Sequence, residues 1–127
     1  MIAGLTLDTG ALLALDQPSK SLAIQARLDE VRYRGGSICI PANVIAQAWR
    51  SSRQVRLARV IRSPDVEIAV LSRNAARIVG ALCKETGHND IVDVHVALCA
   101  RERGHAVVTS DPQDFARIDV SLPLIRV

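Results

Sequence analysis

Short apolar segments alternate regularly with longer helical segments along this chain. No Asn-Gly or Asp-Gly pair marks a hairpin turn between the apolar segments. The strand-like segments are residues 3–7, 37–40, 66–71, 106–109 and 122–127. Strands that are connected through helices pair in parallel. We therefore expect an α/β three-layer sandwich, with a mainly parallel central sheet wrapped by helices.

Two of the expected helices make specific claims about packing. The segment from Ser19 to Gly35 predicts a helix that buries one face, and the residues that we expect on that face are Leu22, Ala26 and Val31, with Leu28 nearby. The segment from about Asp90 to Arg103 is apolar on most of its faces. A helix of this kind packs against neighbours on both sides, so we expect it inside the protein.

Length and composition limit the class of protein. The 127 residues suit a single domain, which we expect to span residues 1–127, and the 49% of hydrophobic residues suffice for a packed core. Cys39, Cys83 and Cys99 form no C-x-x-C pair, which argues against a zinc site or a disulfide framework and favours a reducing cytoplasm. No apolar run has the roughly 18 residues of a membrane span, and the opening lacks the basic start of a signal peptide.

The formal net charge of +3 is distributed unevenly along the chain. Five arginines and no acid lie between residues 50 and 62, in a segment where we expect a helix. Guanidinium groups suit phosphate, and we take Arg50, Arg53 and Arg56 as candidate RNA-binding residues. Arginines at steps of three turn around a helix, however, so a solvated helix is an equal alternative. With only 2% aromatic residues, the chain has no platform for stacking bases.

Aspartates follow two of the expected strands at the point where each strand ends. Asp8 comes directly after residues 3–7, and Asp111 comes two residues after the strand 106–109. In parallel sheets the ligand crevice lies beyond the carboxyl ends of the strands, so both side chains are expected at one edge. Further pairs three residues apart share helix faces, namely Asp90 with Asp93 and Asp111 with Asp114. Clustered carboxylates favour a hard divalent cation such as Mg²⁺ or Mn²⁺.

Each of these acids also has a structural interpretation. Asp90 and Asp111 precede helices, where an aspartate often only caps free N–H groups. Asp114 can simply be solvated. Asp93 lies inside an apolar helix, where an unpaired carboxylate is costly, so a structural interpretation is harder for this residue.

Four short segments resemble the motifs of PIN-domain ribonucleases and, among these, of the VapC toxins of toxin-antitoxin pairs. The resemblance extends over nearly the whole chain, and its specificity lies in the order and spacing of the four motifs. The segments are Leu7–Ala14 (LDTGALLA), Pro41–Arg50 (PANVIAQAWR), Asp93–Ala100 (DVHVALCA) and Thr109–Phe115 (TSDPQDF).

This resemblance implies a PIN-like fold and a metal-dependent endoribonuclease. Asp8, Asp93 and Asp111 would be the catalytic residues that bind Mg²⁺ or Mn²⁺, and Asp90 and Asp114 would support them. One position departs from the family, because Gln47 stands where the second motif usually carries Glu. An amide still offers a carbonyl oxygen to a metal but brings no charge. The resemblance also implies RNA as substrate, a small antitoxin protein as partner, and a homodimer.

Three other interpretations remain. A phosphoryl acceptor of the receiver-domain kind would need a lysine near the last strand, whereas Lys20 and Lys84 lie elsewhere. A protein that binds RNA or a partner without cleavage would account for Gln47. His95 and Cys99 share a helix face at i and i+4, but two ligands make no zinc site, and a packed core pair explains them better.

Overall fold

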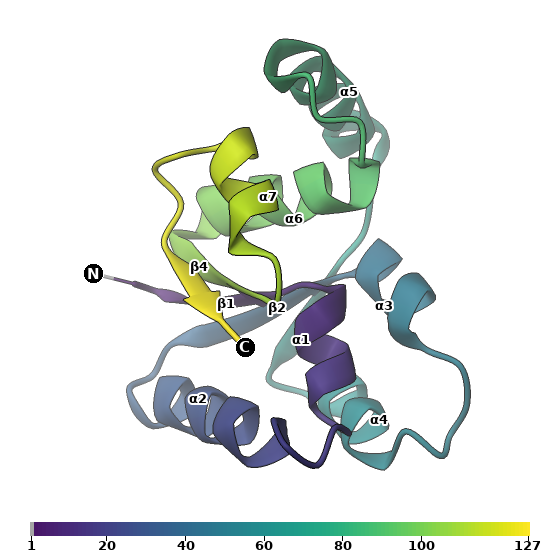
Figure 1. The fold of residues 1–127 in the computed structure, drawn as a ribbon, viewed down its shortest axis with the longest axis vertical. Coiled ribbons are helices and arrows are strands. Elements are labelled where there is room, and N and C mark those ends of the chain that lie inside the picture. Colours follow the sequence, from purple (N-terminus) through teal and green to yellow (C-terminus); the bar gives the residue numbers. More distant parts are fainter. Residues whose placement is uncertain (1) are drawn as a thin grey trace.

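The computed structural model of the chain describes residues 2–127 and contains a central β-sheet. Its five strands pair in parallel throughout, in the order β3-β2-β1-β4-β5 (Figure 1). The strands are β1 (Gly4–Leu7), β2 (Ser37–Pro41), β3 (Val66–Ala69), β4 (His105–Thr109) and β5 (Leu124–Arg126). The expected α/β sandwich with a parallel sheet is confirmed.

Helices cover both faces of this sheet. They are α1 (Thr9–Ala14), α2 (Ser21–Tyr33), α3 (Ala42–Ala48), α4 (Val55–Arg62), α5 (Arg73–Thr86), α6 (Ile91–Arg103) and α7 (Pro112–Ile118). On one face α6 packs across β1, β2 and β4, and on the other α2 and α4 contact the sheet (Figure 1). Helix α5 packs against α6 and forms an outer cover. Among residues 2–127, no helix combines the length and apolar character that a membrane span requires.

Helix α6 is the most enclosed helix, as its sequence predicts. Seven consecutive residues, Val94 to Ala100, are buried between the sheet, α5 and α7. Gly104 ends the helix in the left-handed conformation, with φ of 67°. Because this middle part of α6 is packed in the core, the beginning of the helix is held at a fixed position, close to the carboxyl edge of the sheet.

The topology places a switch point of the sheet at that edge, and we call the space beyond the ends of β1 and β4 the crevice. From β1 the chain adds β2 and β3 on one side, and it later adds β4 and β5 on the other side. Strands β1 and β4 are neighbours, with Leu7 opposite Val108, and their loops leave in different directions. Open parallel sheets bind ligands at such a switch point. Asp8 and Asp111 follow these two strands.

Two local expectations were wrong. On α2 the buried residues are Ser21, Ile24 and Leu28, and Val31 packs partly buried against the core as expected. Leu22, however, is 82% exposed, and Ala26 is also exposed. The helix carries two apolar stripes at a spacing of four residues, and the sheet covers only one. We also expected the five arginines on a helix, but α4 begins at Val55.

Hydrogen bonds of a single side chain stabilise the loop before α4. The backbone becomes extended at Trp49, with ψ of 131°. The Gln54 side chain then accepts hydrogen bonds from the backbone N–H groups of Arg50 (2.7 Å) and Ser51 (3.1 Å), and it donates one to the carbonyl of Ala48 (2.8 Å). One glutamine side chain thus closes the turn. Arg50 and Arg53 consequently lie outside the helix.

Candidate functional site

Asp8 lies at the junction of β1 and α1, and its side chain is held firmly. Its Oδ1 accepts the backbone N–H of Ala11 at 2.8 Å, and its own N–H donates to the carbonyl of Val108 at 3.2 Å. Only 7% of the residue is exposed. Burial raises the pKa of Asp8 and the charge of Asp111 raises it further, while hydrogen bonds from Thr109 and Ala11 lower it. Asp8 is therefore a positioned carboxylate with incomplete charge compensation.

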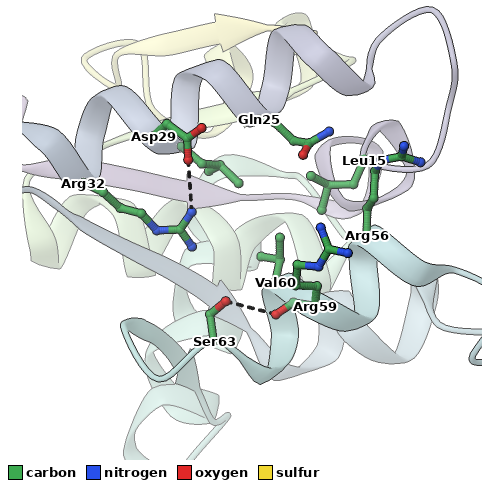
Figure 2. Close-up of a pocket in the computed structure, with 9 residues that line it drawn as sticks. Leu15, Gln25, Asp29, Arg32, Arg56, Arg59, Val60 and Ser63 are labelled. Carbon is green, nitrogen blue, oxygen red and sulfur yellow. Dashed lines mark hydrogen bonds and ion pairs between the residues drawn. The ribbon is translucent and has the colours of Figure 1, made fainter.

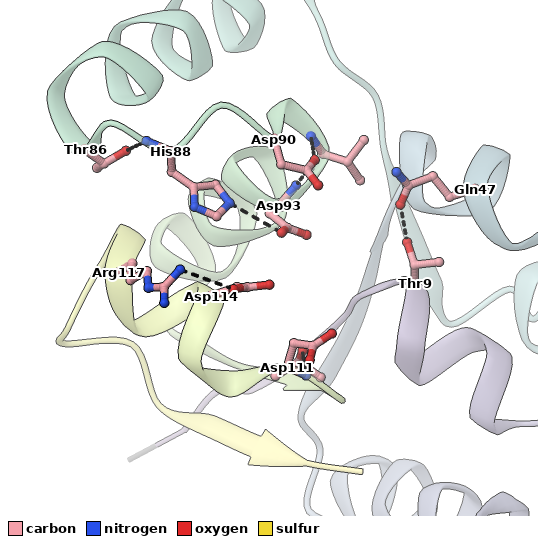
Figure 3. A network of polar contacts seen from close by, with 11 residues as sticks. Thr9, Gln47, Thr86, His88, Asp90, Asp93, Asp111, Asp114 and Arg117 are labelled. Carbon is pink, nitrogen blue, oxygen red and sulfur yellow. Dashed lines mark hydrogen bonds and ion pairs between the residues drawn. The ribbon is translucent and has the colours of Figure 1, made fainter.

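Asp111 occupies the position before α7 but does not cap that helix. Its side chain accepts no hydrogen bond from the backbone of the first turn of α7, and it is exposed. Its backbone N–H donates to the hydroxyl of Thr109 at 2.9 Å, so Thr109 contacts both acids of this edge. The capping interpretation is thus wrong for Asp111. Its carboxylate extends into the space beside Asp93 and Asp114 (Figure 3).

Asp93 approaches the same space from the first turn of α6, with its side chain 24% exposed. The pKa of Asp93 is raised to about 6, mainly by burial and next by the charge of Asp90, while Asp8 adds a smaller effect in the same direction. His88 opposes these effects, because its Nε2 lies 3.5 Å from Oδ2 of Asp93. Asp8 is therefore coupled electrostatically to Asp111 and to Asp93, the other two expected metal ligands.

Asp90 has the structural role that its position permits. Its Oδ1 accepts the backbone N–H groups of Val92 at 3.0 Å and Asp93 at 3.2 Å, so it is the cap of α6. Asp114 lies on the first turn of α7, 3.9 Å from the guanidinium of Arg117, and this pair is largely exposed. Exposed pairs of this kind contribute little to stability. Both acids add negative charge around the crevice.

His88 was not identified from the sequence. It follows the turn at Gly87, where the hydroxyl of Thr86 accepts its backbone N–H at 3.2 Å. This turn brings the imidazole to Asp93 (Figure 3). The contact depends on loop geometry, and no spacing in the sequence indicates it.

Gln47 faces the crevice from α3. Its Oε1 accepts the hydroxyl of Thr9, at the start of α1, at 2.5 Å (Figure 3). The neighbouring Gly10 allows α1 to approach the β4–α7 loop, because a Cβ at position 10 would overlap the hydroxyl of Ser110. Gln47 is exposed, and its carbonyl oxygen already has a partner in Thr9, the residue that follows Asp8.

The candidate RNA-binding arginines have different surroundings. The guanidinium of Arg50 donates to the carbonyl of Trp49 at 2.7 Å, at the end of α3. Arg53 lies exposed in the loop before α4. Arg56 lines a pocket of about 200 Å³ between α2 and α4, together with Arg32 and Arg59 (Figure 2). None of the acids of the crevice lines this pocket.

The donor set fits a hard divalent cation in its chemistry. Carboxylate oxygens are the preferred ligands of Mg²⁺ and Mn²⁺, and the raised pKa values of Asp8 and Asp93 show carboxylates that lack a compensating positive charge. As the side chains stand, however, no three His, Cys, Asp or Glu residues within residues 2–127 lie close enough to hold one ion. The acids are suitable ligands for the ion, but in this structure they do not lie in the positions that coordination of one ion requires.

Comparisons with known proteins identify the family and the fold of the chain. The family model described as the PIN domain matches residues 5–121. The crystal structure of FitAcB from Neisseria gonorrhoeae is similar with a TM-score of 0.68 and 19% identity, covering 96% of both chains. The structure of FitAB bound to the IR36 DNA fragment is similar with a TM-score of 0.67 and 16% identity, covering 96% of this chain and 94% of that one. No curated protein matches the sequence.

Proposed function

The chain belongs to the PIN domain family, and from this premise we propose that it is an endoribonuclease that hydrolyses RNA phosphodiester bonds with a divalent metal ion. PIN domains are generally metal-dependent nucleases. The observation that carries the proposal is the buried carboxylate of Asp8, which is coupled electrostatically to both Asp111 and Asp93 at the switch point of the sheet. Like charges gathered in a partly buried crevice favour a cation between them.

Asp8, Asp93 and Asp111 would hold Mg²⁺ or Mn²⁺, with Asp90, Asp114 and Gln47 in support. A bound ion of this kind lowers the pKa of a water molecule and stabilises negative charge at the phosphorus. The protein itself orients the carboxylates that would bind the ion. The backbone N–H of Ala11 and the hydroxyl of Thr109 orient Asp8.

Protonation of Asp93 sets the pH range of such a site. With a pKa of about 6, its carboxylate is charged and able to bind a cation only above that pH. Nε2 of His88 lies 3.5 Å from Oδ2 of this carboxylate. We expect weaker metal binding below pH 6.

An alternative proposal is a PIN-like protein that binds RNA or a partner without cleaving RNA. It is favoured by Gln47, which brings no charge and whose carbonyl oxygen accepts the hydroxyl of Thr9. This alternative predicts RNA binding without metal-dependent cleavage.

For partners we propose a small antitoxin protein and a homodimer, on the basis of the resemblance to VapC toxins. The chain would then be the toxin of a type II pair, as a single PIN-like domain. An antitoxin arginine in the acidic crevice would supply the positive charge that a metal otherwise brings. Co-expression with a neighbouring small gene tests this, and recovery of the chain alone would count against it.

Cleavage of a mixed RNA pool by the purified chain in Mg²⁺ or Mn²⁺ tests the nuclease proposal. We expect cutting that EDTA abolishes and that Asp8→Asn abolishes. Asp29→Asn, which removes an exposed acid on α2, is the matched control and should cut normally. If wild-type chain binds RNA but cuts in neither metal, and Gln47→Glu restores cutting, the binding alternative is correct.

A further inference from the structure

A second cluster of reactive groups lies away from the acidic crevice. Cys39 of β2 and Cys99 of α6 pack together with Ala69 in a small core of their own, at 0% and 2% exposure. His95 lies one turn before Cys99 on the same helix and is 2% exposed. Within residues 2–127 its buried Nδ1 has no hydrogen-bond partner. Unpartnered buried polar atoms are rare in proteins and call for an explanation.

These groups border a pocket of about 190 Å³ at the start of α5. Cys99 and His95 form part of its wall, so the pocket reaches the part of α6 that carries these two residues. The other lining residues are Ala69, Val70, Ser72, Asn74, Ala75, Ile78, Leu98, Glu102 and Arg103. None of the acids of the crevice belongs to this lining.

The surroundings of Cys99 favour its thiolate. The hydrogen bond with Cys39 lowers the pKa of Cys99 most, and His95 and the Arg103 guanidinium lower it further against the effect of burial. The same pairing raises the pKa of Cys39, and of the two thiols only Cys99 belongs to a residue that lines the pocket. Arg103 is held in place by Glu67 at 2.9 and 2.7 Å and donates to the carbonyl of Cys99 at 3.1 Å. Thiolates, not thiols, are the nucleophiles of cysteine chemistry.

We propose that Cys99 is a modification site for small uncharged peroxides, which reach its sulfur through this pocket, and that Cys39 then closes a disulfide with it. The Cys99 thiolate attacks one oxygen of hydrogen peroxide, the O–O bond breaks, and the released hydroxide takes up a proton to form water. This leaves a sulfenic acid on Cys99.

Cys39 completes the reaction. Its sulfur attacks the Cys99 sulfur, the S–O bond breaks, and the second oxygen leaves as water with the proton from Cys39. In total, two thiols lose two electrons and two protons, and one peroxide becomes two waters. This inference stands apart from the proposed nuclease activity, since it uses none of the residues assigned to that activity.

Cys83 provides an internal control for the test. It lies on α5, is more exposed than Cys99 and packs outside the cluster of Cys39. The folded chain is treated with hydrogen peroxide, and each cysteine is followed by peptide mass spectrometry with a sulfenic-acid trap. We expect oxidation of Cys99 about tenfold or more faster than that of Cys83, because of its thiolate character. Reaction of Cys99 no faster than Cys83 overturns the proposal.

Substitutions separate the two steps and the route of access. Cys39→Ala should leave trapped sulfenic acid at Cys99 in place of the disulfide; no trapped acid and no disulfide at Cys99 would overturn the assignment. Ala75→Leu narrows the pocket and should slow oxidation of Cys99, whereas Ala76→Leu, an exposed neighbour outside the lining, should not. Equal rates in these two variants would show that peroxide arrives by local unfolding and would contradict access through the pocket.

Discussion

Buried polar groups have different surroundings at the two ends of strands β1 and β4. At the amino end, the imidazole of His105 is 2% exposed and has a partner at each nitrogen, Thr6 at 3.0 Å and Ser37 at 2.8 Å. At the carboxyl end, the buried carboxylate of Asp8 faces the charges of two further acids. The same pair of strands therefore holds a satisfied polar group and an unsatisfied charge.

The amino end therefore contributes stability, whereas the carboxyl end has the features of a ligand site. Burial lowers the pKa of His105, so the ring stays neutral, and its two hydrogen bonds offset the cost of burial. Burial raises the pKa of Asp8, and no cation within the described residues lies there to offset its charge. A fold retains such an uncompensated charge where it serves a ligand, and this contrast can be tested in several ways.

The largest expected effect is the loss of activity in Asp8→Asn. The amide retains an acceptor for the N–H of Ala11 but removes the charge that couples to Asp93 and Asp111. We expect metal-dependent RNA cleavage to fall to background, while the free energy of unfolding in urea is unchanged or higher. Full cleavage by this variant would contradict a functional role of the carboxyl end, because the charge at position 8 would then not be needed for activity.

The amino end should respond in stability alone. In Gly4→Ala the new Cβ would overlap the carbonyl oxygen of Ser37 and crowd the ring of His105. We expect the free energy of unfolding to fall by about 2 to 3 kcal/mol, the usual cost of overpacking. Gly80→Ala, in open space on α5, is the control and should raise it by up to about 1 kcal/mol. Both free energies are measured by urea denaturation, and an unchanged value for Gly4→Ala would contradict the tight packing.

A smaller effect is expected in the pH dependence of stability without metal. The pKa of Asp93 is about 6 in the folded chain against an ordinary 3.8, so the folded state binds a proton more tightly. Its carboxyl group therefore lowers the free energy of unfolding as pH rises from about 4 to 6, by roughly 1 to 2 kcal/mol after solvent screening. Asp93→Asn should remove this decrease. The lowered pKa of His105 acts in the opposite direction, and stability is lost as pH falls below 6.5.

The measurement is the difference in free energy of unfolding between wild type and Asp93→Asn across pH 4 to 7. Because His105 is present in both chains, its contribution cancels in this difference. A difference that does not change with pH would mean that the pKa of Asp93 is not raised in the folded chain.

The smallest effect concerns Gln47. Replacing it with glutamate adds one negative charge beside Thr9, on α3. We expect Mn²⁺ to bind about tenfold more tightly, since ligand charge tunes the affinity of such sites. Gln17→Glu adds the same charge at an exposed turn and should leave the affinity unchanged. Calorimetric titration compares the variants, and equal affinities would place Gln47 outside the site.

Much of this arrangement could be predicted from the sequence. Strand and helix order implied the parallel sheet, and the carboxyl-end rule then placed Asp8 and Asp111 together. Contacts between distant segments could not be predicted. Cys39 reaches Cys99 only because β2 lies beneath α6, and His88 reaches Asp93 only through the turn at Gly87.

Two further differences are local. The choice between the stripes of Leu22 and Ile24 on α2 depends on how the helix is rotated against the sheet, which spacing alone does not decide. The loop after α3 depends on hydrogen bonds made by the Gln54 side chain. Neither the rotation of α2 nor these hydrogen bonds can be predicted from the composition of the segment.

Thermal unfolding at pH 7 with and without Mn²⁺ tests whether the carboxyl end of β1 and β4 binds a divalent cation. A ligand that binds only the folded state raises the midpoint of unfolding. We predict that Mn²⁺ raises the midpoint of wild type and of Gly4→Ala, whose acids are intact, and that it leaves Asp8→Asn unchanged. An equal rise in Asp8→Asn, or no rise in wild type, would contradict the account.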